Sequence, residues 1–235
     1  MTVTALVSGG KDSIYSAYLA ETQGRTVDEL VVLRPDDPEE SMMFHTPNLE
    51  LVALQADAWG KEHRTVAVGG RDEASELRAL ERSISGAVGW VVAGAIGSSY
   101  QWARLLDVAG RVGRPLYTPL WRKEPGRVVR EEIAAGLDIR LVHLAAEPLG
   151  PELLGRRLDL PLLQELERRS ATIRRTNVAG EGGEYETLVV DAPFFRSRLA
   201  LDEVERVDQR STSRLIVRRA HLVPKDAPER VARAS

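Results

Sequence analysis

The chain has 235 residues, of which 43% are hydrophobic and 29% are charged, and it contains no cysteine. This length suits one large or two small globular domains. The lack of cysteine excludes Cys-ligated zinc and iron–sulfur sites, persulfide relays and glutaminases with a Cys nucleophile. With 32 basic and 35 acidic side chains the formal net charge is −3, which disfavours a stable nucleic-acid partner. The sequence shows neither a signal peptide nor an apolar run of the roughly 18 residues that span a membrane, so we expect a cytoplasmic protein without a membrane partner.

The first half of the chain alternates short apolar runs with amphipathic segments. Strands are predicted at 2–7, 30–33, 65–68 and 90–96, and helices at 14–22, 46–59, 72–85 and 98–112. Gly24 is placed to end the first helix, and Thr46-Pro47 supplies an N-cap and an N1 proline for the second. Continuous apolar strands that alternate with helices indicate a parallel sheet covered on both faces, which is a doubly wound α/β fold.

The pattern changes near residue 122. Helices are predicted at 128–135 and from Asp159 to about residue 174, and strands at 138–144, 186–190, 199–207 and 215–222. The sequence therefore predicts an α/β domain at 1–122 and a smaller α+β domain at 123–222. The polar residues 223–235, rich in Ala and Pro, are expected to form a disordered tail.

A short polar loop joins the first strand to the first helix, with the sequence Ser8-Gly9-Gly10-Lys11-Asp12-Ser13. Glycines let backbone N–H groups approach a phosphate, and the N-terminus of the following helix favours an anion at the same place. Lys11 adds a charge, the serines add hydroxyl donors, and Asp12 suits either a Mg²⁺ ligand or a helix cap. The loop lacks the spacing of Walker and dinucleotide loops, and the structural alternative is an ordinary glycine turn with a Ser or Asp cap.

A second concentrated pattern combines three glycines and three glutamates with an aromatic ring. The residues are Gly180, Glu181, Gly182, Gly183, Glu184, Tyr185, Glu186 and Thr187. Glycines permit close approach of a ligand, and carboxylates beside an aromatic ring suit a cationic group or Mg²⁺. An acidic turn that leads into the strand 186–190 explains the same pattern equally well. The residues alone leave both interpretations open.

The loop resembles the pyrophosphate-binding loop of the N-type ATP pyrophosphatases, and the two motifs together resemble the diphthine–ammonia ligase family. Further matching segments are Leu33-Arg34-Pro35, Met43-Phe44-His45-Thr46, Gly94-Ala95-Ile96, Ser99-Tyr100-Gln101 with Arg104, and Leu120-Trp121. The resemblance covers about residues 1–222, and the chain is similar to the short, archaeal-type form. It implies a HUP-like, adenine nucleotide alpha hydrolase-like nucleotide-binding domain at 1–122 and a substrate-binding domain at 123–222.

The resemblance implies an ATP-dependent amide ligase of diphthamide biosynthesis. The carboxylate of diphthine on elongation factor 2 is activated as an acyl-adenylate, and ammonium then gives diphthamide, AMP and pyrophosphate. ATP and Mg²⁺ are the implied cofactors, and diphthine-modified elongation factor 2 and ammonium are the implied partners. A homodimer is compatible with the sequence. Because the chain has no cysteine, free ammonium is the expected nitrogen donor.

The resemblance also implies roles for individual residues. The catalytic residues are Lys11, Asp12 and Ser13, with Asp12 as the Mg²⁺ ligand. Nucleotide contacts are expected at Ser8, Gly9, Gly10, Lys11, Asp12, Ser13, Arg34, Gly94, Ala95 and Ile96. Substrate contacts are expected at His45, Ser99, Tyr100, Gln101, Arg104, Glu181, Gly182, Gly183, Glu184, Tyr185, Glu186 and Thr187. Among these, the three glutamates and Tyr185 are expected to surround the trimethylammonium group of diphthine.

Three other functions stay open at this stage. A ligase with the same loop that modifies a tRNA base would need a basic RNA-binding surface, and thiolating versions need cysteine. A ligase that adenylates another carboxylate would keep both motifs. A regulator would bind the nucleotide without turnover, although Lys11 and the intact loop argue against this function.

Overall fold

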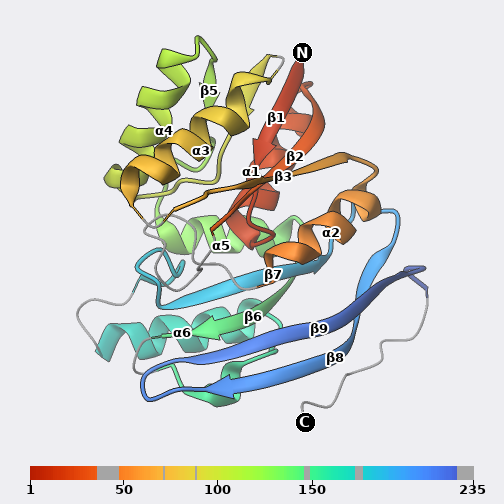
Figure 1. The fold of residues 1–235 in the computed structure, drawn as a ribbon. Helices are drawn as coiled ribbons and strands as arrows, with labels where there is room; N and C mark the ends of the chain where they lie inside the picture. The colour runs from red at the N-terminus through yellow and green to blue at the C-terminus, as the bar shows by residue number, and fades with distance from the viewer. Residues whose placement is uncertain (36–47, 71, 88, 146–148, 173–176, 227–235) are drawn as a thin grey trace.

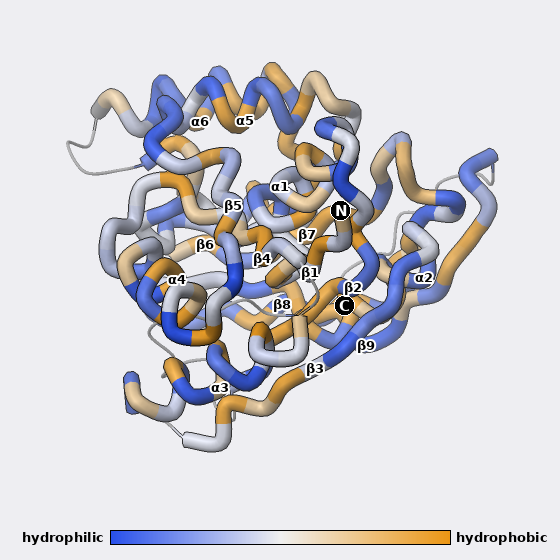
Figure 2. The backbone as a smooth tube through the Cα atoms, turned by 90° about the horizontal axis from the view of Figure 1, so that it is seen from above, coloured by the Kyte–Doolittle hydropathy of each residue, from blue (hydrophilic) through white to orange (hydrophobic). Residues whose placement is uncertain are grey.

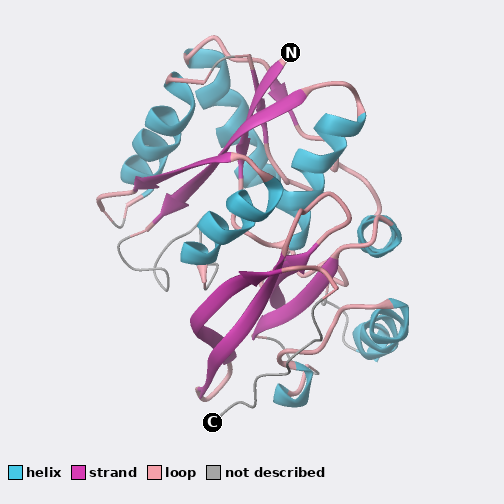
Figure 3. Cartoon of the chain, turned by 90° about the vertical axis from the view of Figure 1, so that its right-hand side faces the viewer, coloured by secondary structure: helices cyan, strands magenta, loops and turns pink. Residues whose placement is uncertain are grey.

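The computed structural model describes residues 1–35, 48–70, 72–87, 89–145, 149–172 and 177–226. These residues form two sheets, one above the other in Figure 1, with the N-terminal half of the chain in the upper sheet. Figure 3 shows the same two tiers from the side, with helices around the upper sheet and the second sheet below. Within the described residues, no helix has the length and apolar character that a membrane crossing requires. The cytoplasmic location stays a prediction.

The upper sheet has five parallel strands in the order β3-β2-β1-β4-β5. Its strands are β1 (Thr2–Leu6), β2 (Thr26–Arg34), β3 (Glu62–Ala67), β4 (Trp90–Val92) and β5 (Leu116–Tyr117). The interior of β1 and most of β4 are buried, as expected for strands covered on both faces. The predicted doubly wound α/β fold is therefore confirmed.

Helices cover both faces of the upper sheet. They are α1 (Lys11–Thr22), α2 (Val52–Trp59), α3 (Glu73–Ser85) and α4 (Ser99–Arg111), and a 3-10 turn (Leu49–Leu51) precedes α2. The α3 and α4 helices pack on one face, whereas α1 and α2 lie between the two sheets (Figure 1). The side chains of Asp72 and Ser98 cap α3 and α4, and Gly24, with φ +78°, follows the end of α1.

The lower sheet is antiparallel and has the order β7-β6-β9-β8. Its strands are β6 (Asp138–Leu144), β7 (Tyr185–Asp191), β8 (Arg198–Asp208) and β9 (Ser213–Val223). The same part of the chain also forms α5 (Pro125–Ala134), a 3-10 turn (Pro151–Leu153) and α6 (Leu160–Thr172). This part has the α+β composition that the sequence predicts. Val223, expected in the tail, is the last residue of β9, and 227–235 lie outside the described residues.

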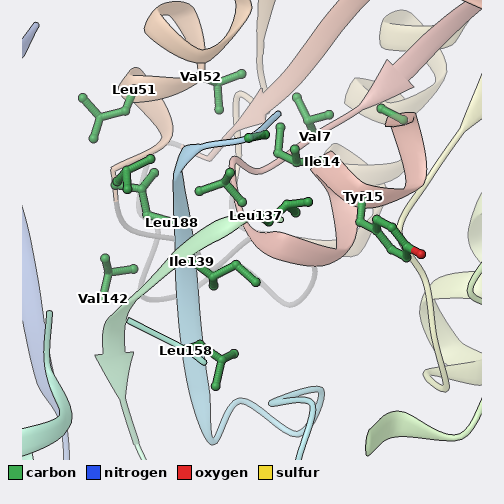
Figure 4. Packing of buried hydrophobic residues seen from close by; sticks show 14 of the residues in the cluster. Val7, Ile14, Tyr15, Leu51, Val52, Leu137, Ile139, Val142, Leu158 and Leu188 are labelled. Carbon is green, nitrogen blue, oxygen red and sulfur yellow. The ribbon is translucent and has the colours of Figure 1, made fainter. Parts of the chain in front are cut away.

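One hydrophobic core joins the two tiers. Val7, Ile14 and Val52 from the N-terminal half pack in the same cluster as Ile139 and Leu188 from the lower sheet (Figure 4). In Figure 2 the central strands are mostly hydrophobic, whereas hydrophobic and hydrophilic residues alternate along α5 and α6. Because the core is continuous across residue 122, the division into two domains stays a prediction.

The strand order indicates which end of the upper sheet can bind a ligand. The chain runs outward from β1 through β2 to β3 and then returns to β4 on the other side of β1. Ligands of open α/β sheets bind outside the carboxyl ends of the strands at such a reversal. The loop 8–13 follows β1 and Gly94 follows β4, so both lie at the carboxyl ends of these two adjacent strands.

Candidate active site

A cavity of about 280 Å³ lies at the carboxyl ends of β1 and β4, between the two tiers. The predicted site residues that line it are Ser8, Gly10, Lys11, Asp12, Ser13, Gly94, Ala95, Gln101, Glu181, Gly183, Tyr185, Glu186 and Thr187. Apolar side chains, among them Leu6, Leu33 and Leu80, complete the wall. The two sequence motifs therefore meet at one site.

Other predicted residues do not line this cavity. They are Gly9, Arg34, Ile96, Ser99, Tyr100, Arg104, Gly182 and Glu184. Arg34 is exposed at the end of β2, and Arg104 binds Glu73 of α3 and stacks on the Tyr100 ring. The expected substrate residue His45 lies outside the described residues, as do the expected helix start Thr46-Pro47 and the segment around Met43.

Hydrogen bonds within the loop hold it as a tight turn. The Ser13 hydroxyl oxygen accepts a hydrogen bond from the Ser8 N–H at 3.2 Å and the hydroxyl donates to the Gly10 carbonyl at 3.1 Å. Gly9 has φ +81°, a conformation that L side chains rarely adopt. Gly10 is the N-cap of α1 and the helix has no side-chain cap, so the capping role considered for Asp12 is wrong. Asp12 lies in the first turn of α1, where its carboxylate binds Lys11 instead.

Contacts with the lower sheet fix the loop from below. The Lys11 N–H donates to Oγ1 of Thr187 at 3.1 Å, and the Val189 N–H donates to the Gly9 carbonyl at 3.0 Å. The fully buried Gln55 of α2 donates from Nε2 to the Gly9 and Val189 carbonyls, at 2.9 and 2.7 Å. These bonds satisfy backbone groups that burial would otherwise leave unpaired. Gln55 was not predicted, although it is a polar residue on the buried face of a helix.

Lys11 is 1% exposed and lies at the centre of a charged cluster. Its Nζ donates to both carboxylate oxygens of Asp12 and to the Ala179 carbonyl, each at 2.8 Å. It also lies 4.0 Å from Oε2 of Glu132 and 5.8 Å from the centre of the Tyr185 ring. Burial disfavours the ammonium, but Asp12 and Glu132 outweigh burial and raise the pKa of Lys11 above its usual value. The side chain therefore carries its charge at neutral pH.

Glu132 of α5 is a site residue that the sequence analysis missed. It is fully buried, and burial, reinforced by the charge of Asp12 and opposed by Lys11, raises its pKa well above the usual value. The sequence contained a sign of this burial, because Glu132 falls on the apolar face of the helix. Val128, Val129 and Glu132 are buried on one face of α5, whereas the neighbouring Glu131 binds Lys123 and Arg127 on the other.

Glu181 connects the second motif to the upper sheet. A single oxygen of its carboxylate, Oε1, accepts hydrogen bonds from the backbone N–H groups of Ile96 at 3.1 Å and Gly97 at 2.7 Å. Burial raises the pKa of Glu181, the Gly97 N–H lowers it in part, and the charge of Asp12 raises it further. The N–H pair that precedes α4 thus already holds a carboxylate at one side of the cavity.

Glu184 and Tyr185 make internal contacts. The Oε1 and Oε2 atoms of Glu184 accept hydrogen bonds from the backbone N–H groups of Asn177 at 2.6 Å and Gly182 at 2.8 Å. The Tyr185 hydroxyl donates to the Val178 carbonyl at 2.7 Å, and burial raises its pKa above the usual value. Glu184 therefore shapes the turn, and the motif offers Glu181 and Glu186 to the cavity.

The Mg²⁺ role expected of Asp12 has no preformed site in the parts of the chain that the structure describes. Both oxygens of the Asp12 carboxylate bind Lys11. No group of three or more His, Asp or Glu side chains among the described residues is arranged to hold a metal ion. Binding of Mg²⁺ stays a prediction.

Comparisons with known proteins agree with the arrangement of the motifs. Two family models match, the diphthamide synthase N-terminal domain at residues 1–115 and the diphthamide synthase C-terminal domain at residues 124–223. The diphthine–ammonia ligase of Rattus norvegicus is 32% identical over 88% of this chain and 85% of its own length, and that of Danio rerio is 32% identical over 88% and 89%. The diphthine–ammonia ligase of Schizosaccharomyces pombe is 29% identical over 97% of this chain, which spans 40% of that protein. The resemblance seen in the sequence is thereby confirmed, and the chain belongs to the diphthamide synthase family of ligases.

Proposed function

We propose that this chain is an ATP-dependent amide ligase that converts diphthine on elongation factor 2 into diphthamide, with ammonium as the nitrogen donor. Membership of the family supports the reaction class. One observation carries the proposal: the phosphate loop and the acidic motif, joined by the Lys11–Thr187 hydrogen bond across 176 residues, line the same cavity. Residues 1–122 then act as the nucleotide-binding domain and 123–222 as the substrate-binding domain. The expected homodimer stays a prediction.

The walls of the cavity fit the parts of ATP. Leu6, Leu33 and Leu80 offer an apolar surface of the kind that receives a flat base. The loop presents the hydroxyls of Ser8 and Ser13 and the N-terminus of α1, which favour a polyphosphate. At Gly94 a Cβ would lie 2.7 Å from the backbone carbon of Asp12, so glycine is needed for β4 to approach the loop this closely.

The proposed chemistry has two steps. A carboxylate oxygen of diphthine attacks the α-phosphorus of ATP, pyrophosphate leaves, and an acyl-adenylate forms. Ammonia, after ammonium has lost a proton, attacks the acyl carbon, AMP leaves and the amide nitrogen releases a further proton to solvent. The charge of Lys11 and the serine hydroxyls would stabilise charge on the phosphates, and the walls would hold the reactants in line.

Diphthine also carries a trimethylammonium group, which needs an anionic or aromatic environment. Glu181 and Glu186 line the cavity on the side of the lower sheet, and we assign them to this cation. Mg²⁺ would enter with the triphosphate and neutralise part of its charge.

The test combines the purified chain with ATP, ammonium and diphthine-modified elongation factor 2. We expect repeated turnover to AMP and pyrophosphate only when all three are present, with at most one pyrophosphate released per active site when ammonium is left out. The factor should gain an amide by mass spectrometry. Turnover triggered by tRNA, or by a small carboxylic acid alone, would contradict the assignment. ATP binding without turnover under any of these conditions would identify a regulator. In cells without this protein, the factor should accumulate diphthine.

A further inference from the structure

Two side chains on neighbouring strands of the lower sheet form a pair beside the cavity. His143 of β6 is the register partner of Glu186 of β7, and Glu186 is among the residues that line the cavity. The register of the two strands is irregular between Leu141 and His143, and irregularities of this kind re-aim a side chain. Nδ1 of His143 lies 3.7 Å from Oε1 of Glu186. This distance is too long for a direct hydrogen bond.

The polar atoms of this pair lack partners among the described residues. Both ring nitrogens of His143 and Oε2 of Glu186 are buried, and none of the three makes a hydrogen bond there. The two side chains are only 11% and 16% exposed. Buried polar atoms without a partner are rare and costly, so the pair is suited to a further group that forms hydrogen bonds with it.

A second histidine–carboxylate pair in the same sheet shows a different arrangement. Nδ1 of His221 in β9 lies 2.6 Å from Oδ2 of Asp202 in β8, so these two side chains bond directly, and neither lines the cavity. The wider spacing of His143 and Glu186 instead leaves room for a bridge. A donor nitrogen about 2.9 Å from both Nδ1 and Oε1 would span their separation of 3.7 Å.

The reactants of the proposed chemistry differ in the hydrogen bonds that they can donate. The phosphates of ATP and the carboxylate of diphthine bring acceptors and negative charge, which Glu186 repels. The trimethylammonium group has a positive charge but no N–H, so it cannot satisfy a buried acceptor. Ammonium combines a positive charge with four N–H donors and is as small as a water molecule. A carboxylate oxygen and the unprotonated nitrogen of a neutral imidazole are acceptors of the kind that it needs.

We propose that His143 and Glu186 form the ammonium subsite of the cavity. This inference rests on the proposed function, because it takes ammonium as the nitrogen donor. The charge of Glu186 then favours both cations of the reaction, whereas the hydrogen bonds to Glu186 and His143 select the cation that carries N–H groups. His143 lies outside both sequence motifs, and the subsite gives it a direct contact with a substrate.

The first measurement is the KM for ammonium of the full chain, with ATP and diphthine-modified factor. His143→Phe removes both ring nitrogens, His143→Asn keeps one acceptor, and His221→Phe is the matched control. We expect the KM for ammonium to rise about tenfold or more in His143→Phe, while the KM for the factor and kcat at saturating ammonium stay within about twofold of wild-type values. His143→Asn should lie between these two proteins, and His221→Phe should match wild-type protein. Glu186→Gln should raise the KM for ammonium and the KM for the factor together.

The second measurement does not depend on turnover. The chain has only four histidines, so histidine labelled with an NMR-active nitrogen isotope gives few ring signals. The signals that disappear in His143→Asn belong to His143. When ammonium chloride is added to wild-type protein with ATP, we expect these signals to shift until the site is saturated. Tetramethylammonium chloride, which has the charge but no N–H, should leave them in place.

Two results would overturn the inference. One is a His143 signal that ignores ammonium or responds equally to tetramethylammonium, and the other is an unchanged KM for ammonium in folded His143→Phe. Thermal unfolding shows whether each variant is folded, and the titration of wild-type protein decides the matter if His143→Phe is not. The expected shift in a protein that never turns ATP over with the modified factor would refute the proposed function and leave the subsite in place. Turnover without the shift would support the function and refute the subsite.

Discussion

The backbone N–H of Lys11 donates a hydrogen bond to Oγ1 of Thr187 at 3.1 Å, although the two residues are 176 positions apart in the sequence. At Gly10, a Cβ would lie 3.2 Å from both the carbonyl oxygen and Oγ1 of Thr187. The first turn of α1 and the start of β7 are therefore in direct contact. A change in either motif should alter the other.

Replacement of Thr187 tests this contact. Thr187→Val keeps the shape of the side chain but leaves the Lys11 N–H without its acceptor, so we expect the free energy of unfolding to fall by about 1–3 kcal/mol. Thr187→Ser, which retains the hydroxyl, is the control. Urea denaturation measures both. Equal stability of Thr187→Val and wild-type protein would show that the N–H finds another partner.

Removal of the Lys11 charge should abolish turnover. Lys11→Met takes the ammonium away from Asp12 and from any bound phosphate, and we expect kcat for AMP formation to fall by about 100-fold or more. Lys61→Met is a suitable control, because Lys61 binds Glu21 and does not line the cavity. A Lys11→Met protein that is folded and within a few-fold of wild-type kcat would contradict the assigned role.

Two of the three glutamates of the second motif, Glu181 and Glu184, should respond differently to loss of charge. The backbone N–H groups of Ile96 and Gly97 both donate to Oε1 of Glu181. The amide oxygen of Glu181→Gln can accept both hydrogen bonds, so this variant loses only the charge. We expect its KM for diphthine-modified factor to rise by about tenfold or more, with little change in stability. An unchanged KM would exclude Glu181 from the cation site.

Glu184→Gln should instead act on the fold. Its two oxygens each accept a different backbone N–H, and an amide turns one acceptor into a donor that faces the N–H of Asn177 or Gly182. We expect a loss of about 1–3 kcal/mol in the free energy of unfolding. If KM for the factor rose while stability stayed the same, Glu184 would have to reach the substrate after all.

The raised pKa of Glu132 also predicts how stability changes with pH. A carboxyl whose pKa is higher in the folded than in the unfolded chain binds more protons when folded, so its contribution is complete below the unfolded value of about 4.3 and is lost as the pH rises through the folded value. Glu132→Gln has no such proton to lose. We expect the variant to become progressively more stable than wild-type protein as the pH rises, measured by urea denaturation in a pH series. A difference that stays constant with pH would show that Glu132 ionises normally.

The sequence predicted the upper sheet well because buried parallel strands are continuously apolar. It placed a strand at 90–96, but β4 ends at Val92, and the next residues, Ala93, Gly94 and Ala95, line the cavity. It missed β5, because the two residues Leu116–Tyr117 carry no periodicity. Short strands are defined by their neighbours in space and not by their own pattern.

The loop and the acidic motif were predicted as sites because each is a continuous run of unusual residues. Gln55 and Glu132 were missed because each is a single polar residue in a helix, and such residues are normally exposed. Arg34 and Arg104 show the opposite case, in which the sequence singled out residues that do not line the cavity, and their expected roles stay predictions. Both lie in segments that resemble the family, yet neither lines the cavity, because Arg34 is exposed at the end of β2 and Arg104 binds Glu73.

The bonds from Gln55 and Val189 to the Gly9 carbonyl have a consequence for the order in which the protein matures. The ribosome makes the phosphate loop at the start of synthesis, but β7, which supplies Val189, emerges near the end. A nascent chain that stops before Tyr185 therefore contains the loop and Gln55 but lacks Thr187 and Val189, which bind the loop in the complete protein. We therefore expect the loop to reach its braced form only after β7 has left the exit tunnel.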